Sequence, residues 1–282
     1  MSLEVNIMKK LDFMIVGTMK SGTTSLAFQL NHNPDICMPP SEIHYFNYDE
    51  NFSKGEKWYE THFKDCDQTC ILGEKTPTYS YLEKIPKRIF EYNPEIKLIW
   101  MFRNPIDRAY SNYYHAKRAG NEKYSFKKAI RLEPERIKND IFKGYLTRSK
   151  YIEQVERYLE YFSIEQMHFI LFEDFVKNPI NVIKDIFKFL EVPFNDFEYQ
   201  DEIKNVARIP RAPRFLKKSR EILGETALLY RIIRKLSFIG RKTGYKKMSP
   251  RLREQLDGYF EVYNKQLGER TGLDISIWQT KK

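Results

Sequence analysis

Short apolar runs alternate with amphipathic segments along this chain. The apolar runs have the length of buried strands, and each amphipathic segment repeats its apolar residues at helical spacing. We expect strands at 11–17, 71–74, 97–102 and 167–172, and helices at 24–31, 84–92, 105–118, 148–162, 178–190 and 250–267. Strands that alternate with helices predict an α/β fold, in which a central parallel sheet is flanked by helices on both faces.

The chain shows no internal repeat, no low-complexity segment and no linker that would divide it. Its 282 residues fit one large α/β domain. We therefore expect a single domain over 1–282. The segment 205–248 is the least regular, and we expect it to hold helices and loops that cover a ligand site.

Hydropathy and cysteine content indicate the cellular compartment in which the protein is expected. No apolar stretch approaches the ~20 residues of a membrane span, and residues 1–10 lack the apolar core of a secretory signal. The three cysteines, Cys37, Cys66 and Cys70, form no dense framework. This pattern favours a reducing cytoplasm. Cys66 and Cys70 lack the second ligand pair of a zinc site, so we expect no metal.

Positive charge is concentrated in one part of the chain. The net charge is +10, and 204–253 contains sixteen Lys and Arg against two Glu, which leaves the rest about −4. Such an excess indicates an anionic ligand or an anionic polymer. Solvated helix faces are the plainer alternative.

The first candidate site follows strand 11–17. Residues 17–24 read Gly-Thr-Met-Lys-Ser-Gly-Thr-Thr and lead into a helix. A strand, a glycine loop and a helix together form a phosphate loop, because backbone N–H groups at the helix start face the anion. Nucleotide kinases carry a lysine directly after the second glycine, where this chain has Thr23. Its lysine, Lys20, lies inside the loop, and this resembles the 5′-phosphosulfate loop of sulfotransferases that use 3′-phosphoadenosine 5′-phosphosulfate (PAPS).

A second candidate anchor follows strand 97–102. Arg103 lies at the carboxyl end of that strand, where open α/β sheets bind ligands. Ser111 follows on the next helix, for which Asn104 is the expected cap and Pro105 the first residue. This arrangement resembles the 3′-phosphate motif of the same family, in which the arginine and the serine hold the 3′-phosphate of PAPS.

Two further segments resemble the heparan sulfate branch of these sulfotransferases. Residues 41–46, Ser-Glu-Ile-His-Tyr-Phe, resemble its Lys-Glu-x-His-Phe-Phe segment, and 73–79, Gly-Glu-Lys-Thr-Pro-Thr-Tyr, resemble its Glu-Lys-Thr-Pro-x-Tyr segment. Residues 240–245 correspond to a loop that closes over PAPS in the family. Ser41 replaces the family's lysine, the C-terminal third lacks the cysteine pair that animal Golgi members have there, and their N-terminal membrane anchor is not found. The resemblance covers about 11–278 and implies a soluble bacterial-type relative with a P-loop-type sheet.

The resemblance implies roles for individual residues. Glu42 corresponds to the base that removes the acceptor proton, and His44 is the rival base, with packing among aromatic residues as its plainer role. Lys20 would contact the leaving oxygen and the sulfuryl group. Lys75 would orient Glu42 or contact the sulfuryl group, unless it only pairs with Glu74. The implied cofactor-binding residues are Thr18, Lys20, Ser21, Gly22, Thr23, Thr24, Ser25, Arg103, Ser111, Arg241, Lys242, Thr243, Gly244 and Tyr245.

The sequence thus predicts in-line sulfuryl transfer from PAPS to a hydroxyl or amine, with 3′-phosphoadenosine 5′-phosphate (PAP) as the second product and no metal required. The acceptor stays open, with anionic and carbohydrate compounds among the options. Nucleic acid is not an expected partner. Two alternatives remain, namely a small-molecule kinase of the P-loop type and a non-catalytic protein that binds polyanions through 204–253.

Overall fold

The computed structural model describes residues 9–67, 69–194, 197–200, 210–239, 244 and 246–279. These residues fall into two compact units. The first holds the described residues of Met1–Arg103, Tyr151–Glu202 and Gln266–Asp274, and the second holds those of Asn104–Lys150, Ile203–Lys265 and Ile275–Lys282. The single domain that we expect over 1–282, with 205–248 covering a ligand site, stays a prediction. Residues 205–209, 240–243 and 245 lie outside the described residues.

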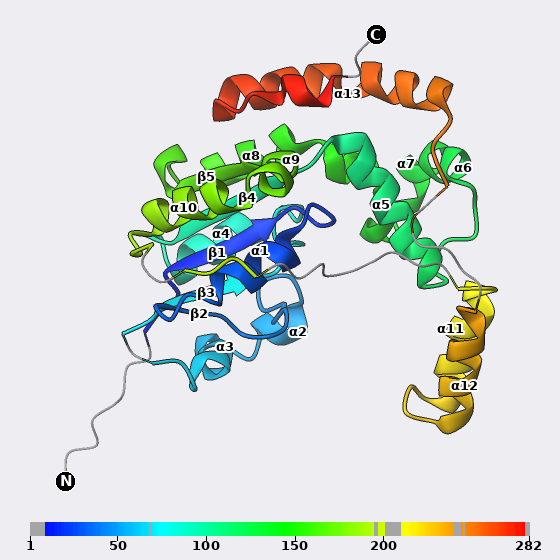
Figure 1. Cartoon of the computed structure of the whole chain (residues 1–282), viewed down its shortest axis with the longest axis horizontal. Helices are drawn as coiled ribbons and strands as arrows, with labels where there is room; N and C mark the ends of the chain where they lie inside the picture. The colour runs from blue at the N-terminus through cyan, green and yellow to red at the C-terminus, as the bar shows by residue number, and fades with distance from the viewer. Residues whose placement is uncertain are drawn as a thin grey trace. The chain divides into compact units, whose positions relative to one another are not determined.

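A parallel sheet forms the centre of the first unit (Figure 1). Its strand order is β2-β3-β1-β4-β5, and every neighbouring pair is parallel. The strands are β1 (Phe13–Gly17), β2 (Ile36–Cys37), β3 (Ile71–Lys75), β4 (Lys97–Phe102) and β5 (Met167–Leu171). The predicted fold class is confirmed, since four of these strands match the expected ones. The two-residue β2 was missed because it is too short to give a hydrophobic pattern.

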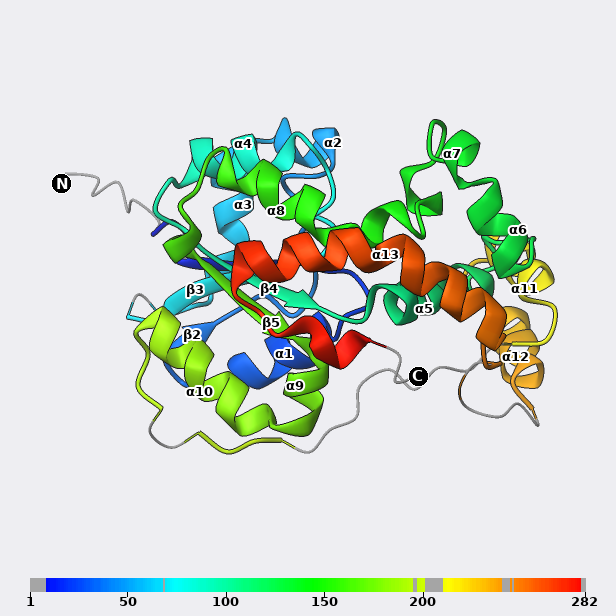
Figure 2. The same ribbon diagram turned by 90° about the horizontal axis from the view of Figure 1, so that it is seen from above.

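Helices cover both faces of this sheet (Figure 2). One face carries α1 (Thr23–Leu30), α9 (Phe172–Lys177) and α10 (Pro179–Leu190), and the other carries α4 (Ile85–Tyr92) and α8 (Tyr151–Leu159). The unit also contains α2 (Asp49–Phe52), α3 (Glu56–Glu60) and the short 3₁₀ turns Thr61–Phe63 and Ile164–Gln166.

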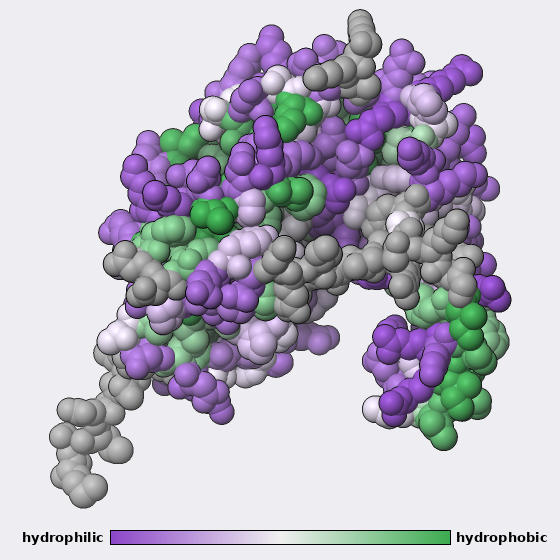
Figure 3. All heavy atoms as spheres, viewed as in Figure 1, coloured by the Kyte–Doolittle hydropathy of each residue, from purple (hydrophilic) through white to green (hydrophobic). Residues whose placement is uncertain are grey.

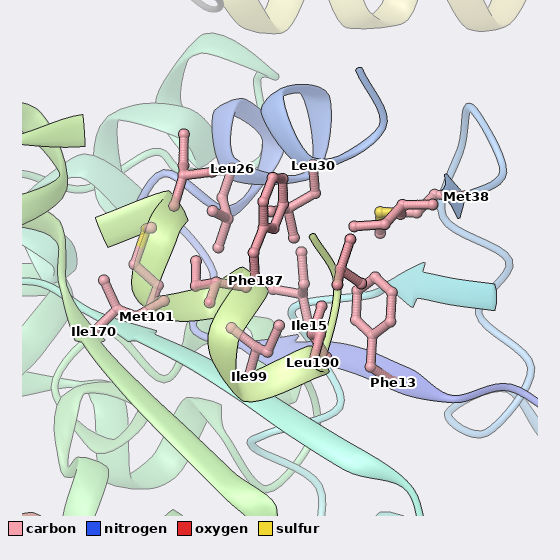
Figure 4. Close-up of a cluster of buried hydrophobic side chains, with 14 of the residues drawn as sticks. Phe13, Ile15, Leu26, Leu30, Met38, Ile99, Met101, Ile170, Phe187 and Leu190 are labelled. Atoms are coloured by element: carbon pink, nitrogen blue, oxygen red, sulfur yellow. The ribbon is translucent and has the colours of Figure 1, made fainter. Parts of the chain in front are cut away.

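Alternate residues of each strand divide between these two helical layers. Ile99 and Met101 of β4 join the cluster formed with Leu26 and Phe187 of α1 and α10 (Figure 4). Between them, Trp100 points the other way, and its ring lies 4.8 Å from the ring of Tyr158 on α8. All of these side chains are buried. Burial on both faces explains why the strands are continuous apolar runs.

The second unit is helical. It contains α5 (Pro105–Arg118), α6 (Phe126–Arg131), α7 (Glu133–Arg136), α11 (Pro213–Leu223), α12 (Leu228–Ser237), most of α13 (Pro250–Thr271) and the 3₁₀ turns Ile141–Lys143, Thr147–Ser149 and Ile275–Trp278. Asn104 caps α5 as expected, because its side chain accepts from the N–H groups of Ile106 and Asp107 at 3.0 and 3.2 Å. Arg253 of α13 pairs with Asp107 at 2.7 Å, and Phe260 packs with Ile106 in the apolar core.

The structure corrects the interpretation of the cysteines. Cys37 and Cys66 form a disulfide across 29 residues of sequence, and Cys70 remains a thiol. Disulfides persist in oxidising compartments and are reduced in the cytosol. A count of cysteines does not show which of them approach one another, so this pair was not expected. The pair argues against a reducing compartment, and the cytoplasmic location stays a prediction. Within the described residues, no helix is long and apolar enough to cross a bilayer.

Candidate active site

The loop between β1 and α1 has the backbone of an anion cradle. Its turn requires positive φ angles at Lys20, 75°, and at Gly22, 94°. A Cβ atom at Gly22 would lie only 2.8 Å from the ring of Phe172, so the position suits glycine on two grounds. Gly22 has no side chain to cap α1, and the N–H groups of the first turn have no partner within the helix. These amides suit an anion.

Buried hydroxyl groups hold the loop in place. The Oγ atoms of Thr18 and Ser21 lie 2.7 Å apart, and the Thr18 hydroxyl donates to the Met101 carbonyl of β4 at 3.0 Å. Both side chains are buried, and the backbone N–H groups of Thr18 and Ser21 donate to the carbonyls of Met101 and Thr18 at 2.9 and 3.2 Å, so these two residues fix the shape of the loop. Farther along, Thr23 is buried, Thr24 is exposed, and Ser25 is half-buried.

Two cations lie beside this loop. Lys20 is half-buried within it. Arg103, directly after β4, donates from Nη1 to the Lys20 carbonyl at 3.3 Å, and its guanidinium lies 4.8 Å from the centre of the Phe172 ring. The pairing of β1 with β4 explains this proximity, because adjacent parallel strands end at the same edge of the sheet. Positive charge is therefore concentrated beside a cradle of amides.

The structure brings the remaining candidate residues of the first unit together. Lys75, at the end of β3, donates to Glu42 Oε1 at 2.6 Å and lies 3.5 Å from the hydroxyl of Thr24. Nε2 of His44 lies 3.4 Å from the other carboxylate oxygen of Glu42. Lys75 thus links the carboxylate to the phosphate loop, with only 14% of its side chain exposed.

His44 has a second neighbour that the sequence did not reveal. Its Nδ1 lies 3.2 Å from Oδ1 of Asn47, so the ring is held between two oxygen atoms. The φ angle of His44 is 58°, which turns the chain sharply after Glu42. Ile43, Tyr45 and Phe46 are buried, as their apolar character suggests, but no local pattern indicated the contact of His44 with Asn47.

Glu74 does not pair with Lys75, its neighbour on β3, because adjacent residues of a strand face opposite ways. Its buried carboxylate accepts hydrogen bonds from the hydroxyls of Tyr59, Thr76 and Tyr79 at 2.5, 2.5 and 3.0 Å. Burial raises the pKa of Glu74 above its ordinary value, and the hydrogen bonds oppose that rise. The sequence did not single out this cluster, although three of its members lie in the 73–79 segment.

The other candidate residues belong to the second unit or lie outside the described residues. Ser111 lies on α5 in the second unit and is buried, whereas Arg103 belongs to the first unit. Gly244 is described with a φ angle of 93°. Arg241, Lys242, Thr243 and Tyr245 lie outside the described residues, and so does the loop that we expect them to form.

A comparison with protein families decides the identity. The family model described as "Sulfotransferase domain" matches residues 10–269. The chain belongs to the sulfotransferase family. Among curated relatives, mouse heparan sulfate glucosamine 3-O-sulfotransferase 5 is 29% identical over 93% of this chain and 72% of its own. The bifunctional heparan sulfate N-deacetylase/N-sulfotransferase 1 of Caenorhabditis briggsae is 28% identical over 95% of this chain and 31% of its own.

Solved structures agree with this assignment. A sulfotransferase from Alicyclobacillus acidocaldarius is 27% identical, with a TM-score of 0.73, and the match covers 96% of this chain and all of that one. Mouse SULT7A1, complexed with PAP, is 19% identical with a TM-score of 0.54 over 94% of this chain and 90% of its own, and shares the fold. This sulfotransferase is therefore an enzyme, and the kinase and non-catalytic alternatives are set aside.

Proposed function

We propose that this sulfotransferase takes its sulfuryl group from PAPS and transfers it to a hydroxyl or amine of a carbohydrate. The observation that carries the proposal is the contact chain from Glu42 through Lys75 to Thr24, because it joins a candidate base to a phosphate loop. Two kinds of relative support it. The curated relatives are named for sulfation of heparan sulfate, and a neighbour of the same fold was solved with PAP.

The residues of the loop fit the 5′-phosphosulfate end of PAPS. Amides of the first turn of α1 would hold the 5′-phosphate, and Lys20 beside them would offset its charge. Arg103, which contacts the same loop, is the proposed partner of the 3′-phosphate. Ser111 and the basic loop 241–245 are further proposed contacts, carried over from the family resemblance. PAPS would supply the sulfuryl group and depart as PAP.

Glu42 is the proposed base, and its geometry favours this role over a purely structural one. Lys75 holds one carboxylate oxygen at 2.6 Å, and the side chain remains 31% exposed, so an acceptor can reach it. A base must lie within hydrogen-bond reach of the proton that it removes. Lys75 orients the carboxylate, while Lys20 would stabilise negative charge on the leaving oxygen. No step of this scheme needs a metal.

Incubation with ³⁵S-labelled PAPS and polysaccharides tests the proposal directly. One acceptor should be an N-deacetylated heparan with free amines, and the other its N-acetylated counterpart with hydroxyls only. We expect label in at least one, unchanged by EDTA. Label in the first alone would assign an amine acceptor, whereas equal labelling would assign a hydroxyl. Absence of label from both, with PAP bound tightly, would remove the carbohydrate part of the proposal.

A further inference from the structure

Helices α11 and α12 pair as a hairpin within the second unit. Residues buried on these helices include Leu216 and Tyr230, and the Arg211 N–H donates to the Ser237 carbonyl at 2.7 Å to close the open end. The hairpin packs against Gly120, just after the end of α5, where a Cβ atom would lie 2.7 Å from the Pro213 carbonyl. These contacts use one side of the hairpin.

The other side carries large apolar side chains in contact with solvent. On α12, Leu228, Leu229, Ile232 and Leu236 fall within an arc of about 100° at 3.6 residues per turn, and Ile239 follows just beyond the helix. Each is roughly half exposed or more, and Leu228 reaches 73%.

The neighbouring helix extends this surface. Phe215 and Ile222 lie seven residues apart on α11, which is two helical turns, and are 62% and 69% exposed. Figure 3 shows the hydrophobic residues gathered along one side of the hairpin and hydrophilic residues along the other. A continuous apolar surface of this kind marks an interaction site more often than an accident of sequence.

Basic side chains lie beside the apolar arc. Arg231 and Lys235 of α12 follow its edge, and both are exposed. On α11, the exposed Lys218 likewise lies at the edge of the apolar surface formed by Phe215 and Ile222. Residues 210–239 contain eight Lys and Arg against two Glu, so the hairpin is strongly cationic.

Neither property alone identifies the occupant, but their combination does. A protein partner would need only the apolar face, and an anionic polymer would need only the cations. An exposed helical face of Leu, Ile and Phe edged by Lys and Arg is the composition of helices that lie in the interface of anionic bilayers. The apolar side chains enter the acyl region while the cations contact the headgroups.

We propose that the α11–α12 hairpin docks on the surface of anionic phospholipid membranes. The proposal concerns a binding surface and does not depend on the sulfuryl transfer. The helices would lie on the bilayer without crossing it, which agrees with the absence of a membrane-spanning helix among the described residues.

Co-sedimentation of the full chain with vesicles tests this docking. The protein should pellet with vesicles of phosphatidylcholine and phosphatidylserine in roughly equal parts, and much less with phosphatidylcholine alone. The triple variant Leu229→Asp/Ile232→Asp/Leu236→Asp should bind at least about 30-fold more weakly, because three apolar anchors are lost. Val176→Asp changes an equally exposed apolar residue on α9 and should leave binding intact.

A second pair of variants examines the charges. Arg231→Glu/Lys235→Glu should weaken binding at least about 10-fold, since each cation contributes to attraction to the headgroups. Lys64→Glu/Lys127→Glu changes the net charge equally at exposed lysines elsewhere and serves as the control. Circular dichroism and thermal melting of every variant show whether the fold is retained.

Insertion can also be observed without any loss of binding. Leu236→Trp places a fluorophore on the apolar face, and its emission should shift to the blue with anionic vesicles and be quenched by brominated acyl chains. An unshifted emission would overturn the proposal even if the protein pelleted.

Three other outcomes would also overturn it. One is an absence of vesicle binding by the wild type. Another is binding that charge reversal weakens and the triple aspartate variant does not, which would make the surface an electrostatic polyanion site. The third is a dimer in sedimentation velocity that the triple variant dissociates, because a second copy of the chain would then cover the apolar face.

Discussion

Glu42 has two close neighbours of different kinds, and this difference leads to the first prediction. Lys75 and His44 each approach one of its carboxylate oxygens, at 2.6 and 3.4 Å. Glu42→Gln keeps the shape and removes the proton acceptor. Turnover with labelled PAPS should fall by roughly 10²–10⁴-fold, while calorimetry should show nearly unchanged affinity for PAP.

His44→Ala is the matched comparison for this change. Loss of its ring removes contacts with Asn47 and Tyr48 but not the proposed base, so turnover should fall less than in Glu42→Gln. Near wild-type turnover of Glu42→Gln, together with an inactive His44→Ala, would assign the base to His44. The proposed contacts of Lys20 and Arg103 with PAPS would be unaffected by that result.

Glu74 gives a prediction about pH. Its folded-state pKa is raised above the ordinary 4.5 by burial, so the folded protein binds more protons than the unfolded chain above that pH. The contribution of Glu74 to stability therefore falls as the pH rises from about 4.5 through the raised pKa. Glu74→Gln lacks this ionisation. The free energy of unfolding of the wild type minus that of the variant, from urea titrations, should decrease over this window.

A difference that stayed constant with pH would mean that the hydrogen bonds from Tyr59, Thr76 and Tyr79 offset the cost of burial completely. Thr76→Val is a useful companion, because it removes one of the donors that lower the pKa of Glu74. In the Thr76→Val background, the contribution of Glu74 to the free energy of unfolding should keep falling to a higher pH than in the wild type.

Which residues could be predicted depended on sequence distance. Glu42, His44 and Lys75 lie in two short segments with a recognisable order, and the structure brings their side chains together. Tyr59 donates to Glu74 from fifteen residues away, and Phe172 lies beneath Arg103 from sixty-nine residues away. Such contacts depend on the tertiary fold, and no local pattern specifies them.

Helices and strands with strong periodicity were predicted nearly residue for residue. The bounds of β4 and α5 agree with expectation, and α10 begins at Pro179 as its Asn-Pro start indicates. The expected helix 148–162 is shorter as α8, because a 3₁₀ turn precedes it at Thr147–Ser149. Short helices such as α6 and α7 were missed, since so few residues carry too weak a periodic signal.

The disulfide between Cys37 and Cys66 gives a prediction for the element that carries Glu42. Cys37 ends β2, five residues before Glu42, so the bridge fixes the start of that segment. A disulfide that closes a loop of this length stabilises a fold by about 2–4 kcal/mol. Cys37→Ser/Cys66→Ser should lower the urea midpoint, and a reducing agent should do the same to the wild type but not to the variant.

Cys70→Ser is the control, because this thiol lies outside the disulfide and its loss should leave the effect of reduction unchanged. Thiol titration of the denatured, non-reduced wild type should count one free cysteine. A count of three would contradict the bridge and restore the expectation of a reducing compartment.

The charge of the molecule is unevenly divided, and the sequence alone showed this. Residues 204–253 carry sixteen Lys and Arg against two Glu, an excess larger than the net +10 of the whole chain. The structure adds what the count could not show, namely that the cations of α11 and α12 border exposed apolar side chains. A charge count has no information on which face a cation occupies. It therefore indicated an anionic partner without distinguishing a nucleotide from a surface.

The last prediction concerns the stability of the whole chain with ligand. A ligand that binds only the folded state stabilises it by about 2.7 kcal/mol at a hundred times its Kd. PAP should therefore raise the melting temperature well above the effect of the same concentration of 5′-AMP, which lacks the 3′-phosphate. Arg103→Ala should lose a charge-assisted contact of roughly 1.5–3 kcal/mol and bring the two shifts together. Arg131→Ala, an exposed arginine of α6, should keep them apart. If Arg103→Ala lowered both shifts equally, Arg103 would be assigned to the 5′-phosphate beside Lys20, to whose carbonyl it donates, and the 3′-phosphate contact would be withdrawn.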